Sequence, residues 1–233
     1  YEGEYPSGVT GLWKMNEGSG TSLTDSSGNG NTGTITGAVY STNVVSRPRT
    51  VATNRFLTRD FVSSLSFNGS TDYVNIYSSA LNTLFNRDEG SFSAWGRLSR
   101  DAWADANSYC IVCVRTDAIN MALIRKETAN NLSFHYTTTA SDRSINLNSV
   151  NYSQWFHVAM TWSKAADNLK AYVNGAQIGT TATTLGSWIS GGLAATGCLI
   201  GARLTTPVQP FNGFIDDIQL FSTPLGSAEI STI

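Results

Sequence analysis

Residues 154–180 constrain the fold of this chain more than any other stretch. Between positions 156 and 162 apolar side chains occupy every second position, which is the period of a strand with one buried face. A second alternating run, residues 169–173, is followed by Asn174-Gly175, a dipeptide that suits the positive φ angles of a tight hairpin turn. The segment therefore predicts consecutive antiparallel strands near the centre of a sheet.

Short segments with strand character run through the rest of the chain and are separated by turn-rich stretches. Only a single helical turn is expected in the tail, near Ala228-Glu229. Many short strands without a long helix predict an all-β fold of two packed antiparallel sheets. The expected strands are residues 11–17, 64–67, 73–76, 91–98, 109–115, 121–125, 132–137, 156–162, 169–173, 176–180, 198–203 and 214–221.

The composition excludes some classes of partner. Hydrophobic residues make up 41 % of the 233 positions, enough for one large folded β domain, whereas charged residues make up only 14 %. The net charge of −2 gives no electrostatic reason to expect nucleic acid, and no apolar run long enough for membrane insertion is present. Because the sequence starts at Tyr1 without a leader, we expect a processed product or a fragment.

The three cysteines are Cys110, Cys113 and Cys198. On a regular strand, residues three apart point to opposite faces with Cα atoms about 10 Å apart, and a disulfide needs them within about 7 Å. We therefore expect buried structural thiols. The alternative is a disulfide between Cys198 and either Cys110 or Cys113.

Five segments, in this order, resemble motifs of the laminin-G-like, concanavalin A-like lectin/glucanase superfamily, of the bacterial and viral type. They are GLWKMNEGSGTSLTDSSGNGNTG, SLSFNGSTDYVNI, GSFSAWGRL, WFHVAMTW with LKAYVNG, and FNGFIDDIQLFSTPLGSAEI. The resemblance implies a two-sheet antiparallel jelly-roll β-sandwich. It covers residues 11–233 as one domain, with residues 1–10 as an N-terminal extension and an arginine-rich insertion near 39–62.

Relatives in this superfamily often hold calcium between two segments that correspond here to the loop at Asp25 and the strand at Asp216. Calcium takes oxygen ligands, so the candidate ligands of one structural Ca²⁺ are Asp25, Gly28, Asn31 and Asp216. Alternation along the last strand predicts that Asp216 points into the core. The alternative is that Asp25 forms an Asx-turn and Asp216 accepts hydrogen bonds from backbone amides.

The sequence does not favour an enzyme. Glucanases of the superfamily carry the pattern E-x-D-x-x-E, and none of the glutamates of this chain stands in it. Asp216 and Asp217 are adjacent, so regular alternation would place them on opposite faces of a strand. A glycoside hydrolase remains the weaker alternative.

Sugar binding needs an aromatic platform beside hydrogen-bonding groups, because a pyranose ring has an apolar face and polar edges. Trp103 and Trp188 stand in loop-like stretches, and Asp101, Asp105 and Asn107 surround the first of them. These five residues are the candidate ligand-binding residues. The alternative is that each tryptophan closes one end of the sandwich.

An interface is the expected role of a third group of residues, since arginine suits carboxylate recognition and protein contacts. The candidates are Arg47, Arg49, Arg55 and Arg59, and the alternative is a solvated loop.

The sequence thus predicts a non-catalytic extracellular carbohydrate-binding or adhesion module. Its partner would be a glycan or cell-surface polysaccharide, and its location the outside of a cell or virion. The alternative is a structural or decoration subunit of a phage particle or extracellular filament, which would contact copies of itself or other virion or filament proteins and bind no sugar.

Overall fold

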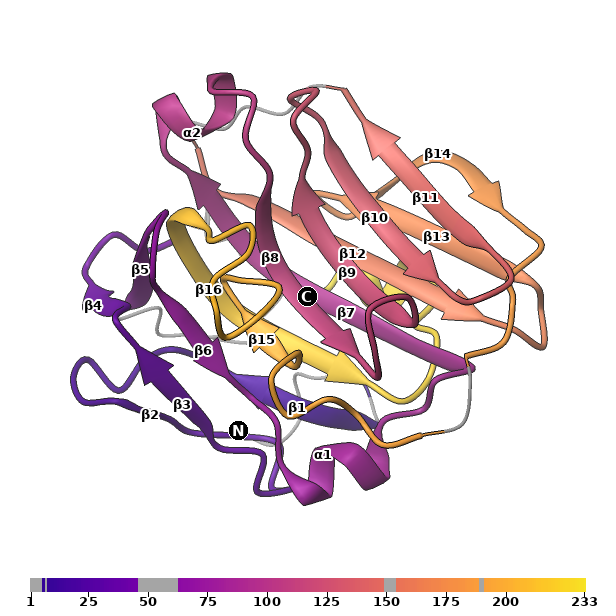
Figure 1. Ribbon diagram of the computed structural model, residues 1–233, viewed down its shortest axis with the longest axis horizontal. Helices are drawn as coiled ribbons and strands as arrows, with labels where there is room; N and C mark the ends of the chain where they lie inside the picture. The colour runs from indigo at the N-terminus through magenta and orange to yellow at the C-terminus, as the bar shows by residue number, and fades with distance from the viewer. Residues whose placement is uncertain (1–5, 7, 46–62, 149–153, 189–190) are drawn as a thin grey trace, which may run out of the picture.

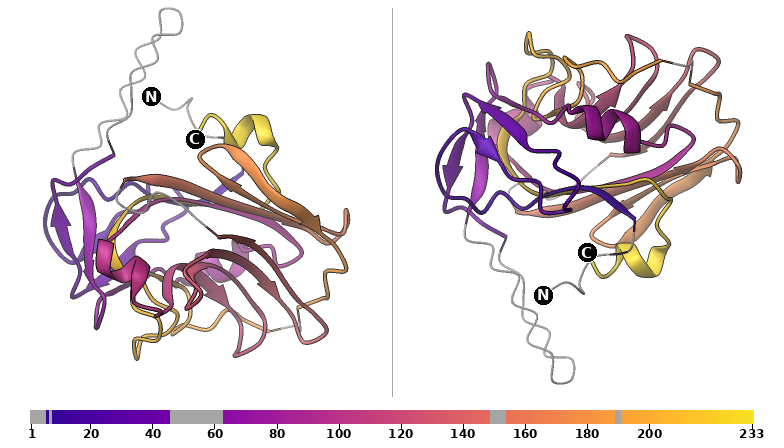
Figure 2. Two further views of the ribbon diagram at one scale, coloured as in Figure 1. Left: turned by 90° about the horizontal axis from the view of Figure 1, so that it is seen from above. Right: turned by 90° about the horizontal axis from the view of Figure 1, so that it is seen from below.

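The computed structural model describes residues 6, 8–45, 63–148, 154–188 and 191–233. Within these residues the chain forms two eight-stranded antiparallel sheets, which pack face to face (Figures 1 and 2). This arrangement confirms the predicted all-β sandwich. The interface candidates Arg47, Arg49, Arg55 and Arg59 lie outside the described residues.

The first sheet holds the segment that dominates the sequence pattern. Its order is β14 (Ala176–Ala182), β13 (Asn168–Val173), β12 (Phe156–Ser163), β7 (Glu89–Leu98), β16 (Asn212–Phe221), β5 (Ser64–Asn68) and β4 (Val39–Ser41), with β1 (Val9–Trp13) beside the second half of β16. Asn174 and Gly175 have φ angles of 50° and 79°, so the predicted turn joins β13 to β14. As expected, β12 and β13 each pair on both sides, whereas β14 forms an edge.

The second sheet packs against the first. Its order is β11 (Asp142–Leu147), β10 (Leu132–Thr137), β9 (Met121–Lys126), β8 (Tyr109–Arg115), β15 (Leu199–Ile200), β6 (Tyr73–Asn75), β3 (Gly33–Thr36) and β2 (Ser22–Leu23). The chain passes from this sheet to the first one between β3 and β4. One edge of the sandwich is therefore formed by β2 and β4.

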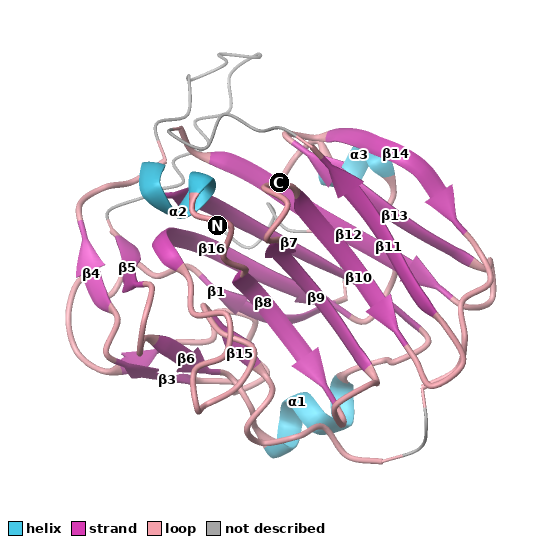
Figure 3. Ribbon diagram, turned by 45° about the horizontal axis from the view of Figure 1, so that its top comes forward, coloured by secondary structure: helices cyan, strands magenta, loops and turns pink. Residues whose placement is uncertain are grey.

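Three short helices join or cover the sheets. α1 (Ser79–Leu84) and α2 (Arg100–Ala104) lie at opposite ends of the sandwich, and α3 (Ser227–Ile230) is the turn expected in the tail (Figure 3). Ile230 of α3 packs with Tyr172 and Phe221 in an apolar cluster separate from the main core, so the tail covers the outer face of the first sheet. None of the described helices is long and apolar enough to span a membrane.

The core between the sheets is rich in aromatic side chains. Trp162 packs against Phe92, with 5.1 Å between ring centroids, and against Tyr136, with 6.2 Å between ring centroids. The Trp162 Nε1 and the Tyr136 hydroxyl donate hydrogen bonds of 3.1 and 2.9 Å to the same acceptor, the carbonyl of Arg87. Both rings are therefore buried with their polar atoms satisfied.

A register shift in β8 corrects the expectation for two cysteines. The shift lies between Cys110 and Val112, and it places Cys110 and Cys113 on the same face, in an apolar cluster with Met121 and Leu123. The prediction of opposite faces was wrong, because a β-bulge inserts one residue and resets the alternation. All three cysteines are buried free thiols, as expected, and burial raises the pKa of Cys113 to about 12.

A second register shift, in β16, corrects the orientation of Asp216. Ile215 and Ile218 both belong to the core, although they are three residues apart. Asp216 is paired in register with Trp95, on the face opposite to Ile215, and Asp217 has a φ of 46° at the shift. The expectation that Asp216 points into the core was therefore wrong, although its side chain is fully buried.

Candidate functional site

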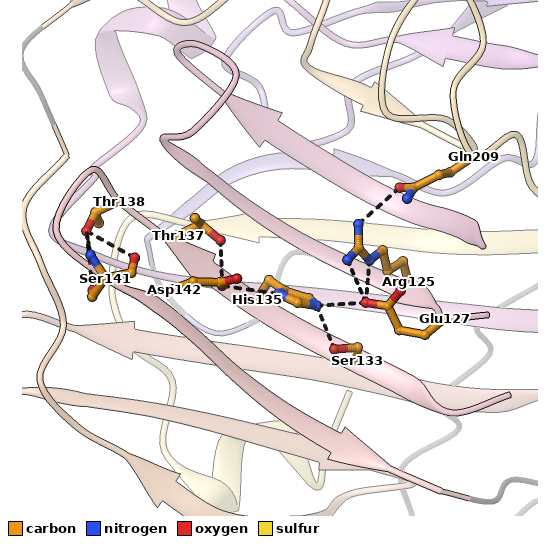
Figure 4. Close-up of polar contacts among 9 residues, drawn as sticks. All are labelled: Arg125, Glu127, Ser133, His135, Thr137, Thr138, Ser141, Asp142 and Gln209. Atoms are coloured by element: carbon orange, nitrogen blue, oxygen red, sulfur yellow. Dashed lines mark hydrogen bonds and ion pairs between the residues drawn. The ribbon is translucent and has the colours of Figure 1, made fainter. Parts of the chain in front are cut away.

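A row of polar side chains crosses the outer face of the second sheet (Figure 4). Leu132, Phe134 and Tyr136 of β10 are buried in the core, so the alternating residues of this strand face outward. Their neighbours on β9 and β11, together with one residue of the β15–β16 loop, extend the set. We call it the polar row, and its members are Gln209, Arg125, Glu127, Ser133, His135, Thr137 and Asp142.

Glu127 is the centre of the polar row. Its Oε1 accepts hydrogen bonds from Arg125 Nε at 2.7 Å and lies 3.0 Å from His135 Nε2. Burial alone would raise the pKa of Glu127, but the hydrogen bond to His135 and the charge of Arg125 outweigh it and lower the pKa to about 2. The carboxylate is therefore charged at any pH at which the protein is expected to work.

His135 connects the two carboxylates of the row. Its Nδ1 lies 3.4 Å from Asp142 Oδ1, and Ser133 Oγ lies 2.6 Å from its Nε2. Thr137 Oγ1 donates to the same oxygen of Asp142 at 2.9 Å. Carboxylates, a guanidinium, hydroxyls and an amide are thus fixed side by side, which is the set of groups that hydrogen-bonds sugar hydroxyls.

The turn between β10 and β11 holds this end of the row in place. The backbone N–H of Thr138 donates to the Ser141 carbonyl at 2.7 Å, and the N–H of Ser141 donates to Thr138 Oγ1 at 3.0 Å. Both groups appear at the left of Figure 4. These hydrogen bonds fix the turn directly before Asp142, the first residue of β11.

The segment formed by the last two residues of α2 and the loop after it contacts the polar row, and we call this segment, residues 103–108, the rim loop. In this loop the N–H of Asn107 donates to Asp105 Oδ1 at 2.9 Å, and the Tyr109 hydroxyl donates to Asp105 Oδ2. Lys126 Nζ donates to the Asn107 carbonyl at 2.8 Å and lies 3.4 Å from Asp105 Oδ1. The predicted residues Asp105 and Asn107 are thus held together by a lysine that the sequence analysis did not identify.

Burial and the neighbouring charges shift the pKa values of Asp105 and Lys126 in opposite directions. Burial would raise the pKa of Asp105, but hydrogen bonds from Tyr109 and Asn107 and the charge of Lys126 give a net lowering. Burial lowers the pKa of Lys126, and the nearby Asp105 partly opposes this effect. Ser108 Oγ donates to Glu127 Oε2 at 3.4 Å, so the rim loop contacts the polar row at this point.

The two candidate tryptophans lie at opposite ends of the sandwich. Trp103 is half-buried on α2, two residues before Asp105. Trp188 is only 7 % exposed and packs against Phe85 and Tyr136, with ring centroids 5.6 and 5.8 Å away. Trp188 therefore closes the α1 end, which is the alternative stated above, and its face is not available to a sugar. The side chain of Asp101 lies outside the described residues.

Three of the proposed calcium ligands, Asp25, Gly28 and Asn31, lie in the loop between β2 and β3, where the Asp25 carboxylate accepts hydrogen bonds from backbone N–H groups. Asp25 Oδ1 accepts hydrogen bonds from the N–H groups of Leu12 and Ser27 at 3.0 and 2.9 Å, and Oδ2 accepts one from Asn31 at 2.8 Å. The contact with Ser27, two residues on, is the Asx-turn stated as the alternative. Asn31 is fully buried, whereas Gly28 is exposed. N–H donors point at Asp25, which suits a structural carboxylate better than a cation ligand.

The fourth proposed ligand, Asp216, stands on β16, and its Oδ1 accepts a hydrogen bond from the Asp217 N–H at 2.9 Å. Within the described residues, no group of three or more histidine, cysteine, aspartate or glutamate side chains is arranged to hold a metal ion. Calcium binding stays a prediction.

A comparison with protein families decides where this chain belongs. Residues 68–231 match the model of the concanavalin A-like lectin/glucanases superfamily. The chain belongs to this superfamily. The match confirms the resemblance seen in the sequence motifs, and the domain has the superfamily's jelly-roll fold. No curated protein sequence matches the chain.

Solved structures share the fold of this superfamily domain. Domain 4 of AbnA, a GH43 extracellular arabinanase from Geobacillus stearothermophilus, in complex with arabinotriose, aligns with a TM-score of 0.64 at 16 % identity, covering 96 % of this chain and 97 % of that one. The receptor binding domain of botulinum neurotoxin D aligns with a TM-score of 0.64 at 16 % identity, covering 96 % and 51 %.

A third structure, the botulinum neurotoxin serotype D ligand binding domain in complex with N-acetylneuraminic acid, gives a TM-score of 0.65 at 16 % identity and coverages of 96 % and 50 %. The present chain thus spans about half the length of the toxin domains. At these identities the likeness shows the fold alone.

Proposed function

We propose that this domain is a non-catalytic carbohydrate-binding or adhesion module that acts outside the cell, and that it binds glycans through the rim loop and the polar row. The observation that carries the proposal is that the buried Lys126 binds both Asp105 and Asn107, in the segment that directly follows Trp103. The arabinanase domain, whose structure contains arabinotriose, is a lectin-like relative in fold and supports a sugar as the ligand.

The rim loop would supply both halves of a sugar contact. The half-buried ring of Trp103 offers an apolar surface, and Asp105 and Asn107 offer acceptors and donors beside it. The hydrogen bonds from Tyr109 and Lys126 fix Asp105 before a ligand arrives. Little side-chain entropy would then be lost on binding, which favours affinity.

The polar row would extend the contact along a polysaccharide. Arg125 and Glu127 form an ion pair with 2.6 Å between Nη2 and Oε1, so their charges largely compensate each other. Paired charges with fixed geometry suit the hydroxyl groups of a neutral or weakly charged glycan. The row therefore favours recognition by hydrogen bonding over recognition by net charge.

A glycan array followed by polysaccharide pull-down tests the proposal. We expect the wild-type protein to bind a defined set of glycans, and the Trp103→Ala and Asp105→Ala proteins to lose at least tenfold in affinity. The matched control is Gln177→Ala on the exposed edge strand β14, which should bind like the wild type. Melting curves of each variant would establish that loss of binding is not loss of folding.

The outcome that would refute the proposal is equally specific. Absence of binding to every glycan of the array, together with ordered polymers in electron micrographs, would support the alternative of a structural or decoration subunit. Release of new reducing ends from a bound polysaccharide, reduced when one carboxylate is neutralised, would instead support a glycoside hydrolase.

A further inference from the structure

A hollow of about 410 Å³ opens at the edge of the sandwich formed by β2 and β4. Its walls are residues 18–21, which precede β2, Ile35 of β3, and residues 37–40, which include the first two residues of β4. In Figure 1, β2, β3 and β4 lie at the left, whereas β9, β10 and β11 lie to their right. The hollow is therefore separate from the surface described above.

The lining of the hollow combines apolar and hydroxyl groups. Val39 is 62 % exposed, whereas Ile35 and Ala38 are buried. Ser19 and Thr21 bring exposed hydroxyls from the facing wall. The described residues that line the hollow include no charged side chain, so it offers no strong attraction for a phosphate, sulfate or carboxylate group.

Tyr40 is the aromatic member of the lining, and its position is fixed. Its hydroxyl donates to Glu17 Oε2 at 2.9 Å, and the carbonyl of Ser22 lies 3.4 Å away. Glu17 is held in turn, because its Oε1 accepts a 2.7 Å hydrogen bond from the N–H of Thr24. Burial and the nearby Glu17 raise the pKa of Tyr40, so the ring stays a neutral phenol.

Glycines keep the backbone of the hollow accessible. Gly18 and Gly20 have φ angles of 72° and 93°, and a Cβ built on either residue would face open space. A ligand can therefore approach their peptide groups closely. Gly37, with φ of 77°, forms the crossing between the two sheets, where an added Cβ would lie 2.2 Å from Asp72 Oδ1. The crossing that shapes the hollow thus requires glycine.

We propose that this hollow is a second glycan contact, which takes one uncharged sugar residue. The partly exposed ring of Tyr40 would cover the apolar face of the sugar, and Ser19, Thr21 and the backbone at Gly20 would bond its hydroxyls. An ionic headgroup finds no counter-charge in the lining, and a lipid chain would leave the hydroxyl wall unsatisfied. The inference builds on the proposed glycan-binding function but concerns a different surface.

Amide chemical shifts of ¹⁵N-labelled protein test the inference, because the hollow contains three glycines with separate backbone signals. The probes are arabinotriose, cellotriose, maltotriose, xylotriose, mannotriose and galactotriose, with sialyllactose as the charged comparison. We expect at least one uncharged trisaccharide to shift the signals of Gly18, Gly20 and Gly37 saturably. The Thr21→Trp protein, with its hollow filled, should bind that sugar at least fivefold more weakly at these signals.

The matched control is Thr180→Trp, which places the same bulky side chain at an exposed position of β14. The inference would be overturned if Thr21→Trp and Thr180→Trp bound the sugar equally well. It would also be overturned if no uncharged probe shifted the signals of the three glycines. Loss of polysaccharide binding in Trp103→Ala without any effect of Thr21→Trp would overturn the second contact and leave the rim loop supported. Loss of polysaccharide binding in Thr21→Trp without any effect of Trp103→Ala would overturn the proposed role of the rim loop and support the hollow.

Discussion

The ammonium group of Lys126 lies 2.8 Å from the carbonyl oxygen of Asn107, and the lysine side chain is fully buried. It also lies 5.5 Å from the centroid of the Tyr109 ring. A buried cation is retained only where hydrogen bonds and opposite charge compensate its lost hydration. Here those partners all belong to the rim loop or its immediate neighbour, so Lys126 orders the proposed binding surface.

Replacing Lys126 by methionine tests this role. Methionine has a similar length and no charge, but it leaves the Asn107 carbonyl without its donor, so we expect the free energy of unfolding to fall by about 1–3 kcal/mol. The rim loop would lose its anchor, and we expect glycan affinity to fall about tenfold, since a hydrogen bond to a charged group contributes about 1.5–3 kcal/mol. Binding titrations and urea unfolding measure the two effects. Lys170→Met on β13 is the control, and equal behaviour of the two variants would contradict the role.

The acid stability of the protein should depend on Glu127. Its pKa is lower in the folded state than its usual value of 4.5, so its contribution to stability is present above about pH 4.5 and is lost as the pH falls towards 2. After allowance for solvent screening we expect about 1 kcal/mol. Urea unfolding between pH 2 and 6 should show a smaller pH dependence for Glu127→Gln than for the wild type. An unchanged slope in Glu127→Gln would disprove the arrangement around Oε1.

The role of Asp25 can be separated from calcium binding. Its three backbone donors would lose their acceptor in Asp25→Ala, and we expect a loss of about 1–3 kcal/mol in the free energy of unfolding. Because the donors belong to the protein, this loss should be the same in calcium and in EDTA. A loss that vanishes in EDTA would make Asp25 a metal ligand. In the wild type, a melting temperature that falls in EDTA and recovers with calcium would support the predicted ion.

Replacing Trp188 by alanine should mainly reduce stability, whereas replacing Trp103 by alanine should mainly reduce glycan binding. Trp188 packs in the core, so we expect Trp188→Ala to lower the free energy of unfolding by about 3–5 kcal/mol. Folded Trp188→Ala protein should still bind glycans, since the α2 end is intact. Trp103→Ala should lose binding at a smaller cost in stability. Thermal melts and binding assays on both proteins compare them directly, and loss of binding in both would argue against a site restricted to one end.

The sequence contains most of the information for the fold. Alternation in residues 156–162 and the Asn174-Gly175 turn predicted strands β12 to β14 because both are local signals. The register shifts at Cys110 and Asp216 have no local signal, since a bulge depends on how the neighbouring strand pairs. Each shift reverses the face of the residues beyond it.

The candidate site could be predicted only in part. Asp105 and Asn107 were predicted as candidates because polar residues surround a tryptophan in a loop-like stretch. Lys126 was missed because nothing in its own segment separates a buried lysine from an exposed one. The outward pattern of Ser133, His135 and Thr137 on β10 is visible in the sequence, but its meeting with Glu127 needs the strand register.

The most direct test of the account is a titration of ¹⁵N-labelled protein with the glycan that binds best on the array. The signals to follow are the Trp103 indole N–H and the side-chain amide of Asn107. We predict saturable shifts of both signals, with one dissociation constant that matches the pull-down. Saturable binding that leaves both signals unmoved would contradict it.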